Sequence, residues 1–479
     1  MTIGKINIHK DYINLLIINL VLLITIVSSP IINVVIEDPS IFLIVGKAMK
    51  DGLILYKEVT DHKGIYLFFM YYIASLISDN SAIGILVISG LLSYVWTIVI
   101  YKITMLLTNE NRKNSFITAV LMCCFFNLAE LTQFGLYSEF FALVSYSISV
   151  YYYIKYKNNN HEMHDKRYAF IYGISIAFTF NIKLNYVIIY IPFLVDILYN
   201  LIKYKQYSNI KDSIKSGFIG LLLGHVPAWT YCILNDCLSD MYYRTIIENV
   251  IYTTNKSGLD NLLYILIYNL SNPLLIFIHL SMIVTIHLIK DKRQKITYIF
   301  TVILNLFILV QSGRIANHYI ITCYILMLPF VIRLTKAINI GICMLILVIT
   351  FIWNYTYNFS NILPISDEYN YMYEQINLNY ADSKKLFIGY SNGIQLYTDT
   401  DIDKFPSLPC VQYSVNSESV DYKIDKINSN EYDVVILSEY KVEKECGKEA
   451  LELLIKTIEC NNYILDNTYK SYKIYVKQL

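Results

Sequence analysis

Charged residues that could take part in chemistry gather just after the first long apolar run, in the segment 37–81. Glu37 and Asp38 open this segment, and His62 and Lys63 follow later in it. A carboxylate can accept a proton from a weak nucleophile, and fixed cations can stabilise a developing negative charge. Ionisable side chains at the end of a membrane span are costly unless they are used or paired. These four residues are therefore the first candidates for a functional site.

Further candidates lie at the ends of later apolar runs. Glu139 opens one run, and Lys183 interrupts a long apolar stretch. Arg314, His318 and Tyr319 lie close together in a short polar turn between two more runs. All five are expected on the same side of the spans as the first four candidates, so they extend the same predicted site.

Each candidate also has a purely structural explanation. Asp38 could cap the helix that follows it, and Lys63 could extend to lipid headgroups. Glu139 could stabilise a helix N-terminus through the helix dipole, Lys183 could face water in a hairpin turn, and His318 could be a structural interface histidine. The residues alone leave both explanations open.

The composition predicts a membrane protein. The chain is 55% hydrophobic and carries only 16% charged residues, with a formal net charge of +1. A span needs about 20 largely apolar residues, and many such runs are present. The near-zero net charge argues against nucleic acid as a partner. The first apolar run, 12–36, is too long for the apolar core of a signal peptide and lacks a cleavage pattern, so we interpret it as a retained span.

The apolar runs predict an α-helical polytopic fold with about eleven transmembrane spans. The segment Gly64–Ile77 is too short to cross and is predicted to lie at the outer interface. The predicted spans are 12–36, 82–106, 116–133, 139–155, 169–182, 184–202, 216–234, 262–289, 297–312, 318–333 and 338–353.

The distribution of lysine and arginine predicts the orientation, because short cytoplasmic loops carry an excess of these residues. Lys5 and Lys10 precede the first span, which places the N-terminus in the cytoplasm. Every later basic cluster can then be cytoplasmic at once, and the C-terminus lies outside. The chain is thus predicted to be a multi-pass protein of the cell membrane. The later clusters contain Arg112, Lys113, Lys155, Lys157, Lys166, Arg167, Lys203, Lys205, Lys211, Lys215, Lys290, Lys292, Arg293, Lys295, Arg333 and Lys336.

Two outer segments, 37–81 and 236–260, are predicted to hold helices of their own. The first contains an N-terminal signal, Asp38 followed by proline, for a helix at about 40–51. The second has apolar residues at helical spacing and predicts an amphipathic interfacial helix at about 241–252.

The composition changes after about residue 353, so we predict a transmembrane region at 1–353 and a small extracytoplasmic α/β domain at 354–479. Short apolar stretches in this region indicate strands, and 449–459 indicates an amphipathic helix. The predicted strands are 386–390, 433–438 and 472–476.

In the order and types of its candidate site residues, the chain resembles the GT-C superfamily of membrane glycosyltransferases, particularly bacterial aminoarabinose transferases and protein-mannosyltransferase-like relatives. Asp38 and Phe42 match an acidic residue followed four positions later by an aromatic, Gly52 ends the short helix, and Lys63-Gly64 stands where relatives often have Lys-Pro. The likeness continues, in the same order, at Tyr137-Ser138-Glu139, Lys183, Gly313-Arg314 and His318-Tyr319, and in a soluble outer tail.

The resemblance implies transfer of a sugar from a polyprenyl-phosphate carrier to an acceptor outside the cytoplasm, with inversion at the anomeric carbon. Asp38 would be the general base, and Lys63, Lys183 and Arg314 would hold the lipid phosphate. The remaining predicted substrate-binding residues are Glu37, His62, Glu139, His318 and Tyr319.

The sequence leaves the sugar and the acceptor open, since lipid, glycan or protein would suit the same chemistry. Glu37 and Asp38 could hold a divalent metal ion, but two adjacent carboxylates do not by themselves indicate one. No P-loop, dinucleotide glycine fingerprint, H-E-x-x-H or G-x-S-x-G motif is present. The lack of a nucleotide motif agrees with a donor linked to a lipid.

Three other classes of membrane protein remain alternatives. A transporter or flippase of lipid-linked sugars would place charges near the membrane midplane and show related halves. A polysaccharide polymerase or ligase would concentrate arginines in one large outer loop. A non-catalytic scaffold would retain its function when Asp38 is replaced by asparagine.

Overall fold

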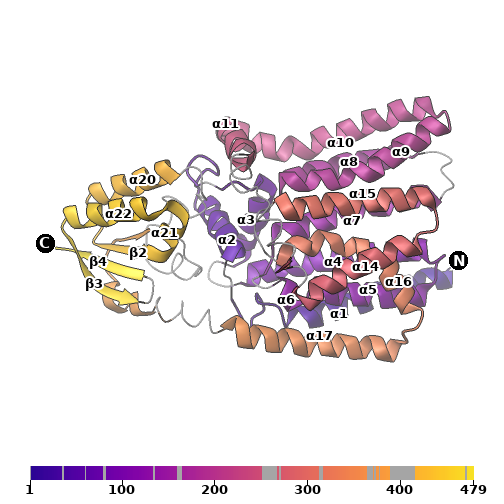
Figure 1. Cartoon of the computed structure of the whole chain (residues 1–479), viewed down its shortest axis with the longest axis horizontal. Helices are drawn as coiled ribbons and strands as arrows, with labels where there is room; N and C mark the ends of the chain where they lie inside the picture. Colours follow the sequence, from indigo (N-terminus) through magenta and orange to yellow (C-terminus); the bar gives the residue numbers. More distant parts are fainter. Residues whose placement is uncertain are drawn as a thin grey trace.

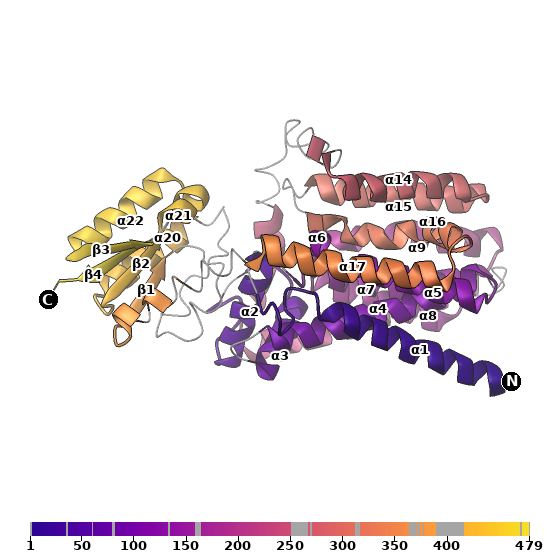
Figure 2. The ribbon, with the colours of Figure 1, turned by 90° about the horizontal axis from the view of Figure 1, so that it is seen from below.

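The structure, a computed structural model, has a bundle of long helices and a smaller α/β region beyond one end of it (Figure 1). The N-terminus lies at the opposite end of the bundle, and a second view agrees (Figure 2). The structure describes residues 2–34, 37–59, 61–78, 82–132, 135–158, 164–250, 267–268, 271–311, 317–363, 371, 374–376, 378–388, 416–469 and 472–478.

Each predicted span overlaps a helix among the described residues. Six of these helices are long and apolar enough to cross a membrane, namely α4, η1–α9, α10, α15, η3–α16 and α17. The number of crossings stays a prediction. The helices are α1 (Thr2–Leu23), α4 (Ile83–Leu107), α5 (Arg112–Phe126), α7 (Ser138–Asn158), α8 (Lys166–Phe180), η1 (Leu184–Tyr190), α9 (Ile191–Lys203), α10 (Tyr207–Leu234), α14 (Pro273–Leu288), α15 (Lys292–Gln311), η3 (Asn317–Met327), α16 (Leu328–Thr335) and α17 (Ile340–Asn361).

The outside of the bundle is apolar, as a bilayer requires. Ile17 of α1, Ile303 of α15 and Leu345 of α17 are 53%, 54% and 57% exposed. Exposing such an apolar surface on several long helices to water is energetically unfavourable, whereas contact with lipid chains is not. The chain is therefore a multi-pass membrane protein.

The predicted first span, 12–36, is wrong in its bounds. Helix α1 begins at Thr2 and ends at Leu23, and turns follow over 24–32. Ser28, Ser29 and Pro30 disfavour a return to helix after these turns, because serine competes for backbone hydrogen bonds and proline lacks the N–H group of a helix.

Buried amides and hydroxyls hold the helices around this break. Asn19 of α1 donates to the Gly90 carbonyl at 3.0 Å and accepts from Ser93 at 2.6 Å. Asn358 of α17 donates to the Thr25 carbonyl at 2.7 Å, which satisfies one acceptor freed at the end of α1. Interhelical hydrogen bonds of this kind fix helix positions in a membrane. They set where the chain leaves α1 and enters the next helix.

Short helices cover the end of the bundle that faces the α/β region (Figures 1 and 2). They include α2 (Glu37–Lys50) and α3 (Ile65–Ile77), which pack together through Phe42, Phe68 and Tyr71, with ring centroids 6.1 and 5.4 Å from Phe42. The others are α6 (Ala129–Thr132), α11 (Leu238–Tyr242) and a π-helical turn, η2 (Tyr243–Ile247). The helix predicted at about 40–51 occurs as α2. The helix predicted at about 241–252 occurs over 241–250, and residues 251–260 lie outside the described residues.

The C-terminal region has a four-stranded sheet in the order β1-β2-β4-β3, with β1 and β2 parallel and the other pairs antiparallel. Three predicted strands and the predicted helix occur with small shifts. Strand β3 was not predicted, because the polar residues Asp466 and Asn467 interrupt its apolar pattern at an irregularity in the register. The elements are β1 (Lys385–Ile388), α20 (Asn416–Asn428), β2 (Val434–Ser438), α21 (Glu439–Cys446), α22 (Lys448–Cys460), β3 (Tyr463–Tyr469) and β4 (Tyr472–Lys477).

Candidate functional site

The segment before α3 docks on the turn that follows α8. The Gly64 N–H donates to the Ile182 carbonyl at 3.1 Å, and the Tyr66 N–H donates to the Asn181 carbonyl at 2.8 Å. A Cβ atom on Gly64 would lie 2.2 Å from the Asn181 backbone, so only glycine allows this approach. The contact brings Lys63 beside Lys183, although 120 positions separate them in the numbering.

A cavity of about 410 Å³ lies where these two segments meet. Its volume falls within the usual range for a small-molecule site. It is lined by Asp38, His62, Lys63, Lys183, Leu184, Asn185, Tyr186, Val187, Ile188, Ile246, Asn249, Val250, Phe307, Ile308, Gln311 and Tyr319. Five of the nine residues predicted for the site thus line one hollow. We call it the Asp38 cavity.

Asp38 lies in the first turn of α2 and is half-buried. It makes no hydrogen bond or ion pair with any described residue, and it lines the cavity. The helix already includes Glu37, so Asp38 is not the residue just before the helix, as a cap would be. A half-buried carboxylate that keeps its accepting oxygens unused is available to a ligand.

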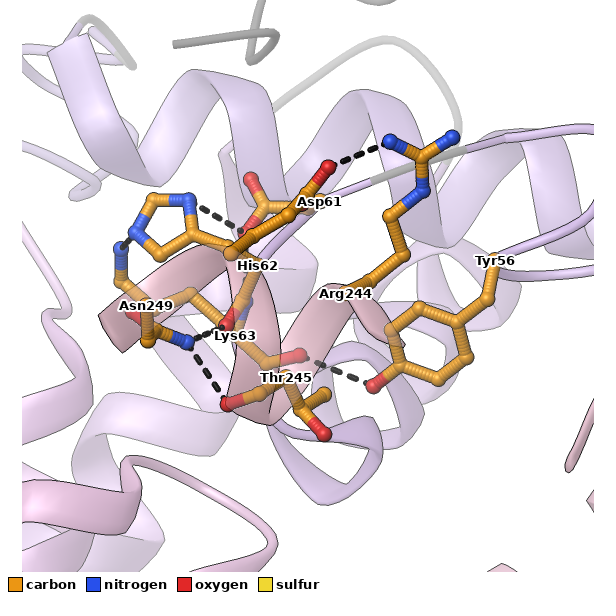
Figure 3. Close-up of polar contacts among 8 residues, drawn as sticks. Tyr56, Asp61, His62, Lys63, Arg244, Thr245 and Asn249 are labelled. Atoms are coloured by element: carbon orange, nitrogen blue, oxygen red, sulfur yellow. Dashed lines mark hydrogen bonds and ion pairs between the residues drawn. The ribbon is translucent and has the colours of Figure 1, made fainter. Parts of the chain in front are cut away.

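Lys63 is held by the residues around it (Figure 3). Its Nζ lies 2.6 Å from His62 Nε2, and its backbone N–H donates to Asp61 Oδ1 at 2.7 Å. The Tyr56 hydroxyl donates to the Lys63 carbonyl at 2.8 Å, and Asn249 donates to the His62 carbonyl at 2.8 Å. The backbone of this segment is therefore fixed on both sides.

The contact between Lys63 and His62 indicates the tautomer of the histidine. An ammonium group has only donors, so Nε2 of His62 must accept and the ring is neutral. The proton then sits on Nδ1, which lies 3.7 Å from Asp61 Oδ1. Asp61 is buried, and its Oδ1 also accepts from the Lys63 backbone N–H, so it lies close to both residues.

Lys183 is fixed by a buried carboxylate and two rings. Its Nζ lies 2.5 Å from Glu139 Oε1, and Glu139 is almost fully buried. The same ammonium lies 4.5 Å from the ring centroid of Tyr319 and 5.3 Å from that of Tyr186. These contacts give the charge a defined position at the cavity wall.

Glu139 and His318 lie behind the wall of the Asp38 cavity. Glu139 contacts Lys183, and its other oxygen accepts from Ser138 at 3.0 Å. The buried His318 ring stacks on Tyr137 with a centroid distance of 3.8 Å and an interplanar angle of 9°. Both are placed to support residues that line the cavity, so their predicted contact with substrate stays a prediction.

Two predicted residues cannot be placed with the others. Arg314 lies outside the described residues. Glu37 begins α2, but its side chain is not among those described. Their roles stay predictions.

Asn249, Gln311 and Tyr186 line the cavity and were not predicted as site residues. Asn249 had a signal, because it lies on the non-apolar side of the predicted helix at 241–252. Gln311 and Tyr186 had none, since a polar residue at a helix end and a tyrosine in a tyrosine-rich chain do not stand out.

The donors around the cavity do not match a metal site. Within the described part of the chain, no three residues among His, Cys, Asp and Glu are grouped so that they could hold a metal ion. The nearest nitrogen ligand, His62 Nε2, is occupied by Lys63. The metal ion considered for Glu37 and Asp38 stays a prediction, and no step of the chemistry is assigned to it.

The arrangement combines two fixed ammonium groups with a carboxylate that has no partner among the described residues, all at one cavity. It can accept a proton at one wall and bind a phosphate at another. The fold and this cavity define a polytopic membrane protein with a small-molecule site at one end of its helical bundle.

Solved structures agree with this fold, although no family model and no curated protein matches the sequence. The crystal structure of ArnT from Cupriavidus metallidurans bound to undecaprenyl phosphate has a TM-score of 0.61 over 99% of this chain and 98% of that chain, at 10% identity. The predicted resemblance to aminoarabinose transferases is confirmed at the level of the fold. The structure of the Archaeoglobus fulgidus oligosaccharyltransferase in complex with Zn and sulfate has a TM-score of 0.48 over 97% of this chain and 73% of that chain, at 10% identity.

Proposed function

We propose that this protein is a glycosyltransferase that moves a sugar from a polyprenyl-phosphate donor to an acceptor at the Asp38 cavity. One observation carries the proposal: the carboxylate of Asp38, which has no partner in the described part of the chain, lines the same cavity of about 410 Å³ as Lys63 and Lys183. The likeness in fold to a structure bound to undecaprenyl phosphate supports a lipid-phosphate donor.

The residues divide the chemistry between them. An acceptor hydroxyl gives its proton to Asp38 while its oxygen attacks the anomeric carbon of the sugar. The bond between that carbon and the phosphate oxygen breaks on the opposite face, so the anomeric configuration inverts. The electron pair of the broken bond remains on the polyprenyl phosphate.

Lys63 and Lys183 stabilise the charge that grows on the leaving phosphate. His62 holds the first ammonium, and Glu139 holds the second. Fixed donors in a cavity stabilise such charge more than mobile ones, because they need not reorganise during the reaction. Arg314 is proposed as a third cation, and Tyr319 as a ring that positions Lys183.

The apolar lining would receive the lipid and sugar carbons. Ile188, Ile246, Val250, Phe307 and Ile308 line the cavity beside the polar groups. We place the cavity on the outer side of the membrane, where a lipid, glycan or protein acceptor would meet the donor. The C-terminal α/β region lies beyond the same end of the bundle and is proposed to guide the acceptor (Figure 1).

The test is a transfer assay on the purified protein in lipid nanodiscs with a panel of polyprenyl-phosphate sugars. We expect turnover with at least one donor and a 100- to 10,000-fold loss in Asp38→Asn. Asp51→Asn is the matched control, because Asp51 follows the same helix and is exposed. The control should retain normal turnover.

An Asp38→Asn protein that folds and transfers sugar at the normal rate would exclude the proposed base. Movement of the intact lipid-linked sugar between leaflets, with no transfer to any acceptor, would instead support the flippase alternative.

A further inference from the structure

A second cavity, of about 890 Å³, lies at the end of the bundle opposite the Asp38 cavity. It is formed by the C-terminal half of α7, by α15 and α16, by the end of η3, by Phe193 of α9, and by the connection between α14 and α15. The α14–α15 and α16–α17 connections lie at the end that carries the N-terminus (Figure 1). No candidate residue for sugar transfer lines it. We call it the Lys336 cavity.

The mouth of the Lys336 cavity is strongly basic. Lys157, Lys290, Arg333 and Lys336 line it, whereas Asp291 is the one carboxylate among its described lining residues. The Asp291 Oδ1 accepts from the Gln294 N–H at 2.7 Å, so this acid caps α15. Among these described lining residues one carboxylate faces four cations, so the positive charge of the mouth is only partly compensated.

Lys157 is already paired with a carboxylate, but the other three cations have no ion-pair partner among the described residues. Lys157 contacts Asp196 Oδ2 at 3.1 Å, and Arg293 contacts Oδ1 of the same carboxylate at 2.8 Å. Lys290, Arg333 and Lys336 are exposed and make no ion pair with any described residue. Three cations converging on a hollow without partners are typical of a site for an anion.

The interior and rim of the Lys336 cavity are apolar. Val150, Ile154, Ile325, Leu328 and Ile332 line it, together with aromatic rings. Leu107 and Leu288 also line it and are 42% and 36% exposed, on the apolar outer surface of the bundle. A ligand here would place a charged group at the mouth and hydrocarbon chains along the rim.

We propose that the Lys336 cavity binds the phosphate of an anionic membrane phospholipid, with its acyl chains against the apolar rim. Free phosphate shares the charged group but not the chains. Basic residues between membrane helices commonly bind anionic headgroups on the cytoplasmic side, which is where the lysine and arginine distribution places this end.

Native mass spectrometry of the delipidated full-length protein tests the proposal with three probes: phosphatidylglycerol, phosphatidylcholine with the same acyl chains, and inorganic phosphate. We expect phosphatidylglycerol to bind most tightly. The variant R333Q/K336Q should weaken its binding roughly 25-fold, or about fivefold for each cation removed. The variant K203Q/K205Q removes two exposed cations that do not line the cavity and should bind as the wild type does.

Three results would overturn the proposal. Equal binding of phosphatidylcholine would exclude recognition of the anionic headgroup. Equal binding of inorganic phosphate would exclude a contribution from the chains and assign the site to a soluble anion. Unchanged phosphatidylglycerol binding in a folded R333Q/K336Q protein, verified by its melting temperature, would exclude this cavity as the site.

Discussion

The two ends of the helical bundle use the same groups, a carboxylate and nearby cations, in opposite ways. At one end Asp38 has no partner among the described residues, while Lys63 and Lys183 are held by other side chains. At the other end Asp196 is paired, since Tyr153, Lys157 and Arg293 all contact it within 3.1 Å.

The difference separates a group available for chemistry from one used for structure. A buried carboxylate with two cationic partners has no capacity left to take a proton from a substrate. An unpaired carboxylate at a cavity retains that capacity. Charge type alone is therefore a poor guide to function, and the state of pairing is a better one.

Removal of the carboxylate at each of the two ends should give the largest contrast. Asp38→Asn should lower turnover by at least 100-fold and leave the melting temperature close to that of the wild type. Asp196→Ala should leave turnover per folded molecule near normal but destabilise the protein by about 3 kcal/mol, because Lys157 and Arg293 lose their shared partner. Transfer assays and thermal unfolding in detergent measure both effects. A loss of stability in Asp38→Asn equal to that in Asp196→Ala would remove the contrast.

Gly64→Ala should disturb the Asp38 cavity through the backbone. The added Cβ would meet the Asn181 backbone at 2.2 Å, so the Lys63 segment must shift away from Lys183. We expect about 1–3 kcal/mol of destabilisation together with a fall in turnover of tenfold or more. Gly341→Ala is the control, because its Cβ would meet only the Asn339 side chain, at 3.3 Å. Normal turnover in Gly64→Ala would show that the approach of Lys63 to Lys183 is not needed.

Glu139→Gln should weaken donor binding by releasing Lys183. The neutral amide cannot replace a charge-assisted contact, which contributes about 1.5 kcal/mol or more, so we expect the KM for the donor to rise about tenfold. Turnover at saturating donor should fall less. The exposed Glu110→Gln, outside the cavity, is the control. A fall in kcat as large as that of Asp38→Asn would mean that Glu139 takes part in proton transfer.

The smallest expected effect is a dependence of stability on pH that comes from His164, which is remote from the Asp38 cavity. Burial lowers the pKa of His164 to about 4, and its Nδ1 lies 2.9 Å from Ser213 Oγ. The unfolded chain takes up this proton near pH 6.5, so stability should fall as the pH drops from about 6.5 to 4 and stay flat above 7. At pH 5.5 the loss is about 1 kcal/mol, and His164→Asn should abolish it. Parallel melting profiles for the two proteins between pH 7 and 5 would contradict this.

Much of the fold followed from the sequence, because apolar runs and charge bias are local signals. The helices, the mixed α/β tail and the helices at 40–51 and near 241 were predicted, although some bounds differ by eight or nine residues. Helix α10 begins at Tyr207 instead of 216, and α17 ends at Asn361 instead of 353. The end of the first span was not, since Ser28, Ser29 and Pro30 interrupt the helix inside a run that remains apolar on average. Strand β3 was missed for the converse reason, because Asp466 and Asn467 lower the apolar signal of a strand that pairing with β4 stabilises.

The sequence by itself determined a membrane-embedded helical chain with charges at the ends of its spans, because hydrophobic length and the cost of burying charge act on each segment separately. It also singled out Asp38, Lys63 and Lys183. Only the tertiary structure decided which of these charges remain unpaired. Three contacts join residues that are distant in sequence. They are the packing of Gly64 against Asn181, the ion pair of Lys183 with Glu139, and the ion pairs of Asp196 with Lys157 and Arg293. Pairing depends on distances of a few ångströms, and such distances are set only when the helices pack.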